Sequence, residues 1–484
     1  MNLVTDPWVP VIYINKESKK VSLNQLYQDA ESIRDLIVTP PQRVAVMRLL
    51  ICITQAALDG PDDEGDWYNC RDRIARESLR YLKEKMDCFE LYGERPFLQY
   101  RTLGCDMDKL KEKAMLDQRL ATGNNSTFFD HEAVAGSRIF EDHEAALNFL
   151  TFLNFSTSGK VGQAILDNMK YSDSTFRAPC VKYAHTFVMG ENINDTIFLN
   201  LLTKNGEANG IVNMPNSGWG KPVWEMFPKD VQDTKAFENA SHTYLGRLVP
   251  LSRFIRLELR DNEAKCIIGP THKDYSIQQL PLHQEPSGTV VRSKKDDTLY
   301  YLQLSSNKHM WRELGSITSM NMEIHGARGA MTLNNLNIYY GEENKKVSIW
   351  VGGMELGKNE GKINDFLEWR FSFELSQMYN ENVQKYKNRV EQANVGENSL
   401  IFAIKKYCGD LSIDTPPYHK GRHHYWSNLD AKSKILIDTD NFIDVDREWD
   451  NIIKTAMHNA YAFACPHTTP RQIQAFAAGK RRLH

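Results

Sequence analysis

The sequence has few of the features that mark secreted, membrane-spanning or disulfide-stabilised proteins. Its eight cysteines include no C-x-x-C pair, which argues against a zinc ribbon and against a disulfide framework. No window approaches 18 consecutive uncharged apolar residues, and the N-terminus has no basic segment followed by an apolar core. We therefore expect neither secretion nor a membrane span, and a cytoplasmic location.

The sequence also lacks an excess of charge of either sign. It has 59 Lys and Arg against 62 Asp and Glu, a formal net charge of −3. Such a chain has no overall basic field, so any contact with nucleic acid must come from local clusters shared with partner chains. Its 484 residues predict two or three domains, and 41% hydrophobic residues argue against disorder.

The first part of the chain mixes helix and strand patterns. "WVPVIYI" alternates like one arm of a hairpin, and the dense apolar pattern at 40–58 is typical of a buried helix. Further helices are expected at 76–93 and 142–155. The stretch 244–351 is rich in short β-favouring runs such as "RFIRLELR", "TVVRS", "TLYYLQL", "LNIYYG" and "VSIW". An antiparallel or mixed sheet is the expected product.

After about residue 376 the pattern becomes helical. Three helical stretches with apolar stripes run to residue 464, and the last helix opens at a Thr-x-x-Gln capping box, Thr469 to Gln472, with Pro470 at its first position. The predicted fold is therefore α+β. It has a large mixed domain over 1–360 and a C-terminal four-helix bundle over 361–484.

A glycine-rich stretch follows the strand-like "VSIW". Gly352, Gly357 and Lys358 have the G-x-x-x-x-G-K spacing of a phosphate-binding loop, but the next residue is Asn359 where Ser or Thr normally holds magnesium. Glu360 would also put a carboxylate near the phosphates. A P-loop-like NTPase using residues 352–359 is thus the alternative function, and a hinge or a loop that approaches a ligand closely is favoured.

Two other loops offer a lysine next to small residues or a turn. In "FSTSGKVG", Ser158, Gly159 and Lys160 would let the backbone approach a nucleic-acid groove and a lysine reach phosphate. The competing interpretation is a plain helix C-terminus with Gly159 near the cap. "GPTHKDYS" places His272 and Lys273 at a turn between strands, where a single exposed lysine usually has no special role.

Other chemistries find little support in the sequence. His419 and His423 are four residues apart, but Gly421 is expected to interrupt the helix and no acidic partner is suitably spaced. A structural or phosphate-contacting role is favoured over zinc. No Ser-His-Asp, Cys-His or paired-carboxylate arrangement has usable local spacing, which leaves only a catalytic centre assembled from distant segments.

Five segments, in order along nearly the whole chain, resemble the CasA family, the large subunit of the type I-E CRISPR surveillance complex Cascade. They are "MNLVTDPWVPV", "RPFLQ", the helix leading into "STSGKVG", "FLNLL" and "ACPHTTPRQIQAFAAGKRRL". The resemblance implies a non-enzymatic subunit without cofactor or metal. It would recognise the protospacer-adjacent motif (PAM) in double-stranded DNA from the minor groove, help open the duplex into an R-loop, and recruit the CRISPR helicase-nuclease. Its partners would be the other Cascade subunits, CRISPR RNA and target DNA.

The resemblance also implies roles for particular residues of this sequence. The PAM-binding residues would be Ser158, Gly159, Lys160, Lys273 and its neighbour His272. The wedge that enters the duplex beyond the PAM would be Lys358, Asn359, Glu360 and Gly361. A loop within 121–137 would reach the complex and the guide RNA through Phe128, Phe129, Asp130 and His131. Since the minor groove mainly separates A·T from G·C, a tolerant readout is expected.

Overall fold

The computed structural model divides into two compact units. The N-terminal unit comprises residues 1–306, 329–343 and 347–371, and the C-terminal unit comprises 307–328, 344–346 and 372–484. The structure describes the chain except for residues 107–109, 121–140, 162, 172–173, 214–217, 261–262, 271, 273–274, 276–284, 342, 359–360, 438–443 and 484. The predicted domain boundary at 360/361 stays a prediction. The compact units instead part within a strand, and the second also takes in 307–328.

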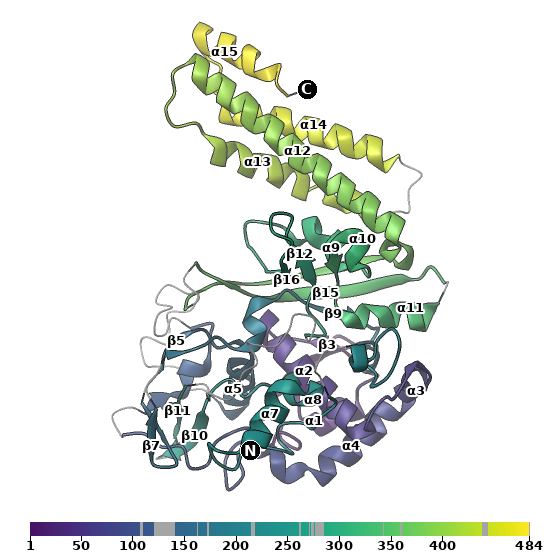
Figure 1. Cartoon of the computed structure of the whole chain (residues 1–484), viewed down its shortest axis with the longest axis vertical. Helices are drawn as coiled ribbons and strands as arrows, with labels where there is room; N and C mark the ends of the chain where they lie inside the picture. Colours follow the sequence, from purple (N-terminus) through teal and green to yellow (C-terminus); the bar gives the residue numbers. More distant parts are fainter. Residues whose placement is uncertain are drawn as a thin grey trace. The chain divides into compact units, whose positions relative to one another are not determined.

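Helix α2 (Pro40–Leu58) is at the centre of the N-terminal unit (Figure 1). It opens with a capping box between Thr39 and Gln42, and its residues from 41 to 55 are buried. It packs against α4 (Ile74–Glu84), α5 (Asp142–Phe155) and α8 (Tyr244–Leu248). The predicted helices at 40–58 and 142–155 are confirmed. The helix expected over 76–93 is shorter, because a 3-10 turn, Met86–Phe89, follows α4.

Small antiparallel sheets surround these helices. The predicted hairpin at "WVPVIYI" is confirmed, since β1 (Val9–Tyr13) pairs with β2 (Ser18–Val21). In the strand-rich middle, β10 (Ile255–Arg260) pairs with β11 (Glu263–Ile268), and β12 (Val290–Arg292) pairs with β13 (Leu299–Tyr301). A further sheet has the strand order β16, β15, β9. Its strands are β9 (His185–Met189), β15 (Lys346–Leu356) and β16 (Ile363–Glu374).

The prediction of a strand at "LNIYYG" is wrong, because this segment forms helix α11 (Asn334–Tyr340). The buried Asn335 amide donates to the carbonyls of Leu199 and Leu201, both at 2.8 Å. The Tyr339 ring lies 5.4 Å from the Phe198 ring. These contacts with one neighbouring segment outweigh the β preference of isoleucine and tyrosine.

The C-terminal unit is built mainly of helices. Helix α12 (Asn380–Asp410) contacts α13 (Tyr418–Asp430), α14 (Val445–Ala464) and α15 (Pro470–Lys480), as Figure 1 shows for the first two. The capping box at the start of α15 is confirmed, because the Thr469 hydroxyl accepts a hydrogen bond from the backbone amide of Gln472. The fold is therefore α+β with a C-terminal helical region. In the part of the chain that the structure describes, no helix is both long and apolar enough to span a membrane.

Candidate nucleic-acid interface

The predicted glycine loop is one side of a short strand pair. β5 (Gly159–Lys160) pairs antiparallel with β8 (Ser174–Thr175), and the Ala178 amide donates to the Ser156 carbonyl at 2.7 Å. We call residues 156–160 and 174–178 the glycine strand pair. Helix α5 has its C-cap at Ser156, so Gly159 is not the cap of that helix.

Gly159 has a backbone conformation that other residues rarely adopt. Its φ is +144°, and a Cβ built on it would meet nothing within 4 Å. The backbone geometry, and not lack of space, is therefore the reason for glycine. Ser158 and Gly159 are half-buried and Lys160 is exposed. This strand thus combines a position without a side chain, Gly159, with one exposed lysine.

A buried arginine supports the glycine strand pair from inside. Arg253 is 1% exposed, and its Nη2 donates to the Thr157 carbonyl at 2.8 Å while its Nη1 donates to the Ser252 carbonyl at 2.6 Å. The Ser252 hydroxyl in turn donates to the carbonyl of Leu153 in α5. Burial lowers the pKa of Arg253 to about 9, so the guanidinium is still charged at neutral pH. It fixes the backbone one residue before Ser158.

The segment that carries Lys273 is anchored by an aromatic stack. The His272 ring is 5% exposed and lies 3.9 Å from the Phe237 ring, nearly parallel to it at 6°. The Tyr275 amide donates to the His272 carbonyl at 3.1 Å. Lys273 lies outside the described residues. The His272 side chain therefore packs in the core and does not form part of the surface.

An ion pair fixes the chain at Glu285, on the far side of Lys273. The carboxylate of Glu285 lies 2.5 Å from Nη1 of Arg48, a buried residue of α2. Burial alone would raise the pKa of Glu285, but Arg48, His185 and the Ser287 hydroxyl together outweigh it and the pKa is lowered. Arg48 also donates to the carbonyls of Arg247 and Leu248. Residues on both sides of 273–284 are thus held by the core of the N-terminal unit.

The stretch with phosphate-loop spacing is a β-hairpin, so the P-loop interpretation is wrong. Gly352 lies inside β15, where it pairs with His185 of β9. A Cβ at Gly352 would lie 2.6 Å from the Trp350 ring and 2.7 Å from the Leu367 carbonyl oxygen. Close packing therefore requires this glycine. A phosphate cradle needs free backbone amides in a loop that opens a helix, whereas this chain continues into β16.

The wedge predicted from the sequence falls on the turn between β15 and β16. The Gly357 amide donates to the Lys362 carbonyl at 2.9 Å and closes the turn. Lys358 is exposed and Gly361 is half-buried, while Asn359 and Glu360 lie outside the described residues. The Gly357–Lys362 hydrogen bond thus joins the ends of two long strands, β15 and β16.

A cleft of about 450 Å³ lies beside this tip. We call it the hairpin cleft. Both Arg177, of the glycine strand pair, and Lys358 line it. The Glu355 carboxylate also belongs to its wall, but it is 8% exposed and accepts from the Ser306 amide at 3.0 Å. The structure thus brings the glycine strand pair and the wedge turn to one polar cleft.

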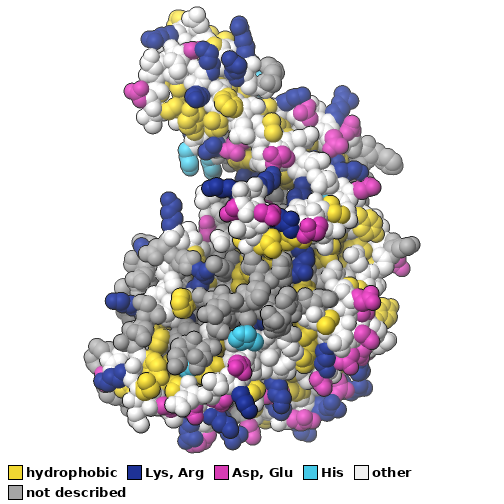
Figure 2. All heavy atoms as spheres, in the orientation of Figure 1, with side chains coloured by type: hydrophobic (Ala, Val, Ile, Leu, Met, Phe, Trp, Pro, Cys, Tyr) yellow, Lys and Arg dark blue, Asp and Glu magenta, His cyan; other side chains and the backbone are white. Residues whose placement is uncertain are grey.

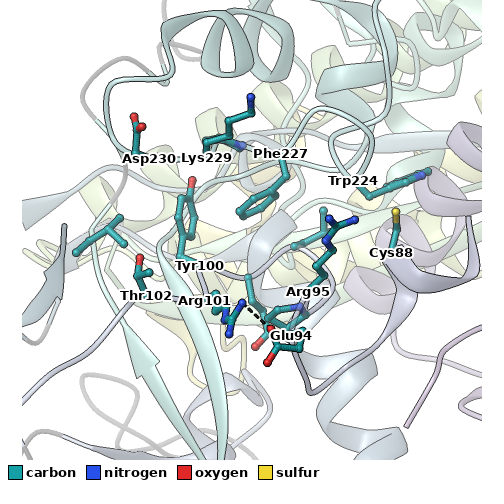
Figure 3. Close-up of a pocket in the computed structure, with 15 residues that line it drawn as sticks. Cys88, Glu94, Arg95, Tyr100, Arg101, Thr102, Trp224, Phe227, Lys229 and Asp230 are labelled. Atoms are coloured by element: carbon teal, nitrogen blue, oxygen red, sulfur yellow. Dashed lines mark ion pairs between the residues drawn. The ribbon is translucent and has the colours of Figure 1, made fainter.

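A second cavity, of about 340 Å³, is lined in part by residues of the "RPFLQ" motif (Figure 3). Gln99 holds this segment in place, because its amide donates to the Leu91 carbonyl at 2.8 Å and its oxygen accepts from the Leu257 amide at 2.6 Å. The Glu94–Arg101 ion pair, dashed in Figure 3, is largely exposed. The buried hydrogen bonds of Gln99 give this motif a structural role.

The remaining candidates are distributed over the chain. Helix α13 is continuous through Gly421, so the expected break between His419 and His423 is wrong. Within the described part of the chain, no group of three or more His, Cys, Asp or Glu could hold a metal ion. Phe128, Phe129, Asp130 and His131 lie outside the described residues. Figure 2 shows Lys and Arg interspersed with Asp and Glu over the face in view, as the net charge implies.

Sequence reasoning missed three residues of this region. Arg253 and Arg177 gave no signal, because a single arginine is common and neither forms a motif. Phe176, between Arg177 and β8, is 68% exposed. An aromatic residue close to a glycine–lysine loop could have drawn attention, but strand pairing between residues 14 and 16 positions apart is not visible in the sequence.

Comparisons with known proteins agree on one family. The family model described as CRISPR-associated protein Cse1 matches residues 2–460. The CRISPR-associated protein CasA/Cse1 of Thermus thermophilus is 25% identical over 351 residues, 70% of this chain and 64% of that protein. The alignment thus spans just under two thirds of the relative.

Solved structures share the fold over the whole chain. The structure of Thermus thermophilus CasA (Cse1) matches with a TM-score of 0.77 at 20% identity, covering 100% of this chain and 98% of that one. A chain of a structure described as a CRISPR RNA-guided surveillance complex matches with a TM-score of 0.76 at 15% identity, covering 100% and 99%.

Proposed function

Because the chain belongs to the CRISPR-associated protein Cse1 family, also named CasA, we propose that it is the PAM-reading large subunit of a type I-E Cascade complex. The observation that carries the proposal is the hairpin cleft, which Arg177 and Lys358 both line. These two cationic residues come from segments far apart in the sequence and lie at the same cleft. A DNA groove with its flanking phosphates is a ligand of that chemistry.

The glycine strand pair would lie against the minor groove at the PAM. Its backbone, left open at Gly159, can approach the groove closely, and Lys160 can contact phosphate. Lys273 would donate to the minor-groove acceptors, which A·T and T·A pairs share. His272 would not touch DNA. Its stacked, buried ring would instead fix the backbone that presents Lys273.

The turn between β15 and β16 would act as the duplex wedge through Lys358, Asn359, Glu360 and Gly361. Parting the first base step costs a few kcal/mol, which pairing with the guide RNA and contacts with the DNA backbone offset. The backbone hydrogen bond from Gly357 to Lys362, with a long strand on either side, supports this role.

The remaining roles concern partners. Phe128, Phe129, Asp130 and His131 would contact the guide RNA and the complex. The chain would recruit the helicase-nuclease that degrades the target, and would itself catalyse no reaction. With a net charge of −3, it depends on the guide-bearing subunits for most of the positive channel. The division into domains 1–360 and 361–484 belongs to the same proposal.

Lys273→Ala in the assembled complex tests the proposal, with Lys295→Ala as the matched control. Lys295 is an exposed lysine in the turn between β12 and β13. We expect Lys273→Ala to reduce the preference for PAM-containing duplex about tenfold, the size of one base-reading contact. Lys295→Ala should leave the preference unchanged. Equal PAM preference in wild type and Lys273→Ala would remove the lysine from the reading site.

A further inference from the structure

Phe176 is an exposed aromatic residue on the glycine strand pair. Its side chain is 68% exposed, more than that of any other large hydrophobic residue described. The pairs Gly159–Thr175 and Lys160–Ser174 and the Ala178–Ser156 hydrogen bond share one antiparallel register. This register places Phe176 directly opposite Ser158. Directly opposite residues of an antiparallel pair present their side chains on the same face.

The surroundings of Phe176 suit a nucleic base. Ser158, directly opposite, has only a small side chain to share this face with the ring. Lys160 is exposed on the same strand pair. Arg177, the next residue along the chain, lines the hairpin cleft together with Lys358. The strand pair that carries Phe176 thus also carries Lys160 and Arg177, and Arg177 reaches the cleft at the turn that would open the duplex.

A single exposed apolar side chain is ordinary on a protein surface. Phe176 differs because it belongs to the same strand pair as the backbone that would face DNA. A mixed aromatic and basic surface is the pattern with which proteins bind unpaired nucleotides, since every base has a face on which an aromatic ring can stack. An apolar ring also helps to keep a base step open once it is parted.

We propose that Phe176 stacks on one unpaired base of the target DNA where the duplex opens beside the PAM. This inference rests on the proposed function, because it needs a duplex held by the glycine strand pair. Phe176 would hold the displaced base while the wedge turn occupies its former place. It would add sequence-tolerant affinity for the opened state, and it would make no contact with phosphate.

Abasic DNA tests the proposal in the assembled complex. Duplexes that contain the PAM and a single abasic nucleotide at successive positions beyond it, on either strand, are bound to wild type and to Phe176→Ala. We expect roughly a tenfold loss of wild-type affinity at one position of the scan, the usual size of a base–aromatic contact. Phe176→Ala should show a similar loss on intact duplex and no further loss at that position, because the two changes remove the same contact.

Two control variants separate stacking from structural damage. Phe176→Trp keeps an aromatic face and should bind like wild type. Met169→Ala removes another exposed apolar side chain, 57% exposed on the strand β7 (Met169–Tyr171), and should also bind like wild type. The dependence of affinity on salt should be unchanged in Phe176→Ala, whereas loss of a phosphate contact lowers its slope by about one.

Three results would overturn the inference. The ring holds no base if Phe176→Ala binds intact duplex with wild-type affinity. The same conclusion follows if the loss caused by Phe176→Ala multiplies with the loss caused by the abasic nucleotide at every position of the scan. Failure of Phe176→Ala to enter the complex would show that the ring contacts a partner protein. If the wild-type complex shows no PAM preference, the proposed function itself is wrong. This outcome is distinguishable from the other three, because it is seen with wild type alone and needs no variant.

Discussion

The glycine strand pair offers a test in which backbone conformation alone is changed. Gly159→Ala adds a methyl group that meets nothing within 4 Å, so no contact is lost and no atom is displaced. The alanine must nevertheless hold a φ of +144°, which costs about 1–3 kcal/mol. The strand pair can avoid this cost by rearranging.

The rearrangement would have to be reversed on binding, so the cost appears as lost affinity. A penalty of about 1–3 kcal/mol corresponds to a loss of roughly 5- to 150-fold. The assay is equilibrium binding of the assembled complex to PAM-containing duplex. The thermal midpoint should change little, because each affected strand is only two residues long and the one that carries Gly159 is partly exposed.

Two other glycines provide matched controls. Gly104→Ala also adds a methyl group with nothing within 4 Å, but its φ is not positive, so it should change neither affinity nor stability. Gly93→Ala carries a comparable backbone cost, since its φ is +124°, at a position outside the strand pair. It should leave PAM binding intact. If Gly159→Ala binds like Gly104→Ala, the conformation of Gly159 has no part in DNA recognition.

Two further predictions concern buried groups. Arg253→Met removes the hydrogen bond to the Thr157 carbonyl, and loss of such a charge-assisted bond, worth about 1.5–3 kcal/mol, should weaken PAM binding. The salt dependence of binding should keep its slope, because a side chain that is 1% exposed reaches no phosphate. A lower slope would contradict this positioning role. Burial, with opposing effects of Glu285 and Arg48, lowers the pKa of His185 from 6.5 to about 4. As pH falls, His185 is therefore protonated in the unfolded chain before it is protonated in the folded one, which favours unfolding. Through His185, wild type should lose about 2 kcal/mol of folding free energy between about pH 7.5 and pH 5. His185→Gln should lack that component in denaturant titrations at the two pH values, and an equal pH effect in both proteins would refute the assignment.

Local signals in the sequence predict the helices well. The dense apolar pattern at 40–58 predicts α2, and the capping box at Thr469 marks where α15 begins, because it depends only on residues three positions apart. "LNIYYG" shows where this reasoning fails. Its β-favouring residues form a helix because Asn335 bonds to two carbonyls more than 130 positions away, and no local pattern reports such a partner.

The candidate site was predictable as a set of loops and not as a surface. The spacing of Gly352 and Lys358 is shared by a phosphate loop and by this hairpin, and only the pairing of Gly352 with His185 separates them. The burial of His272, which stacks on Phe237, was not visible in the sequence. The importance of Arg253 depends on a contact made across the fold. Chemistry that lies within one loop can be predicted, whereas contacts between distant segments require the structure.

The most direct test of the proposed function compares the guide-RNA complex assembled with and without this chain. Binding to duplexes that match the guide is measured with the PAM present and with the PAM replaced. We predict that the complex prefers PAM-containing duplex only when the chain is present. An equal preference in the complex that lacks the chain would contradict this proposal, and would assign the chain a purely architectural role.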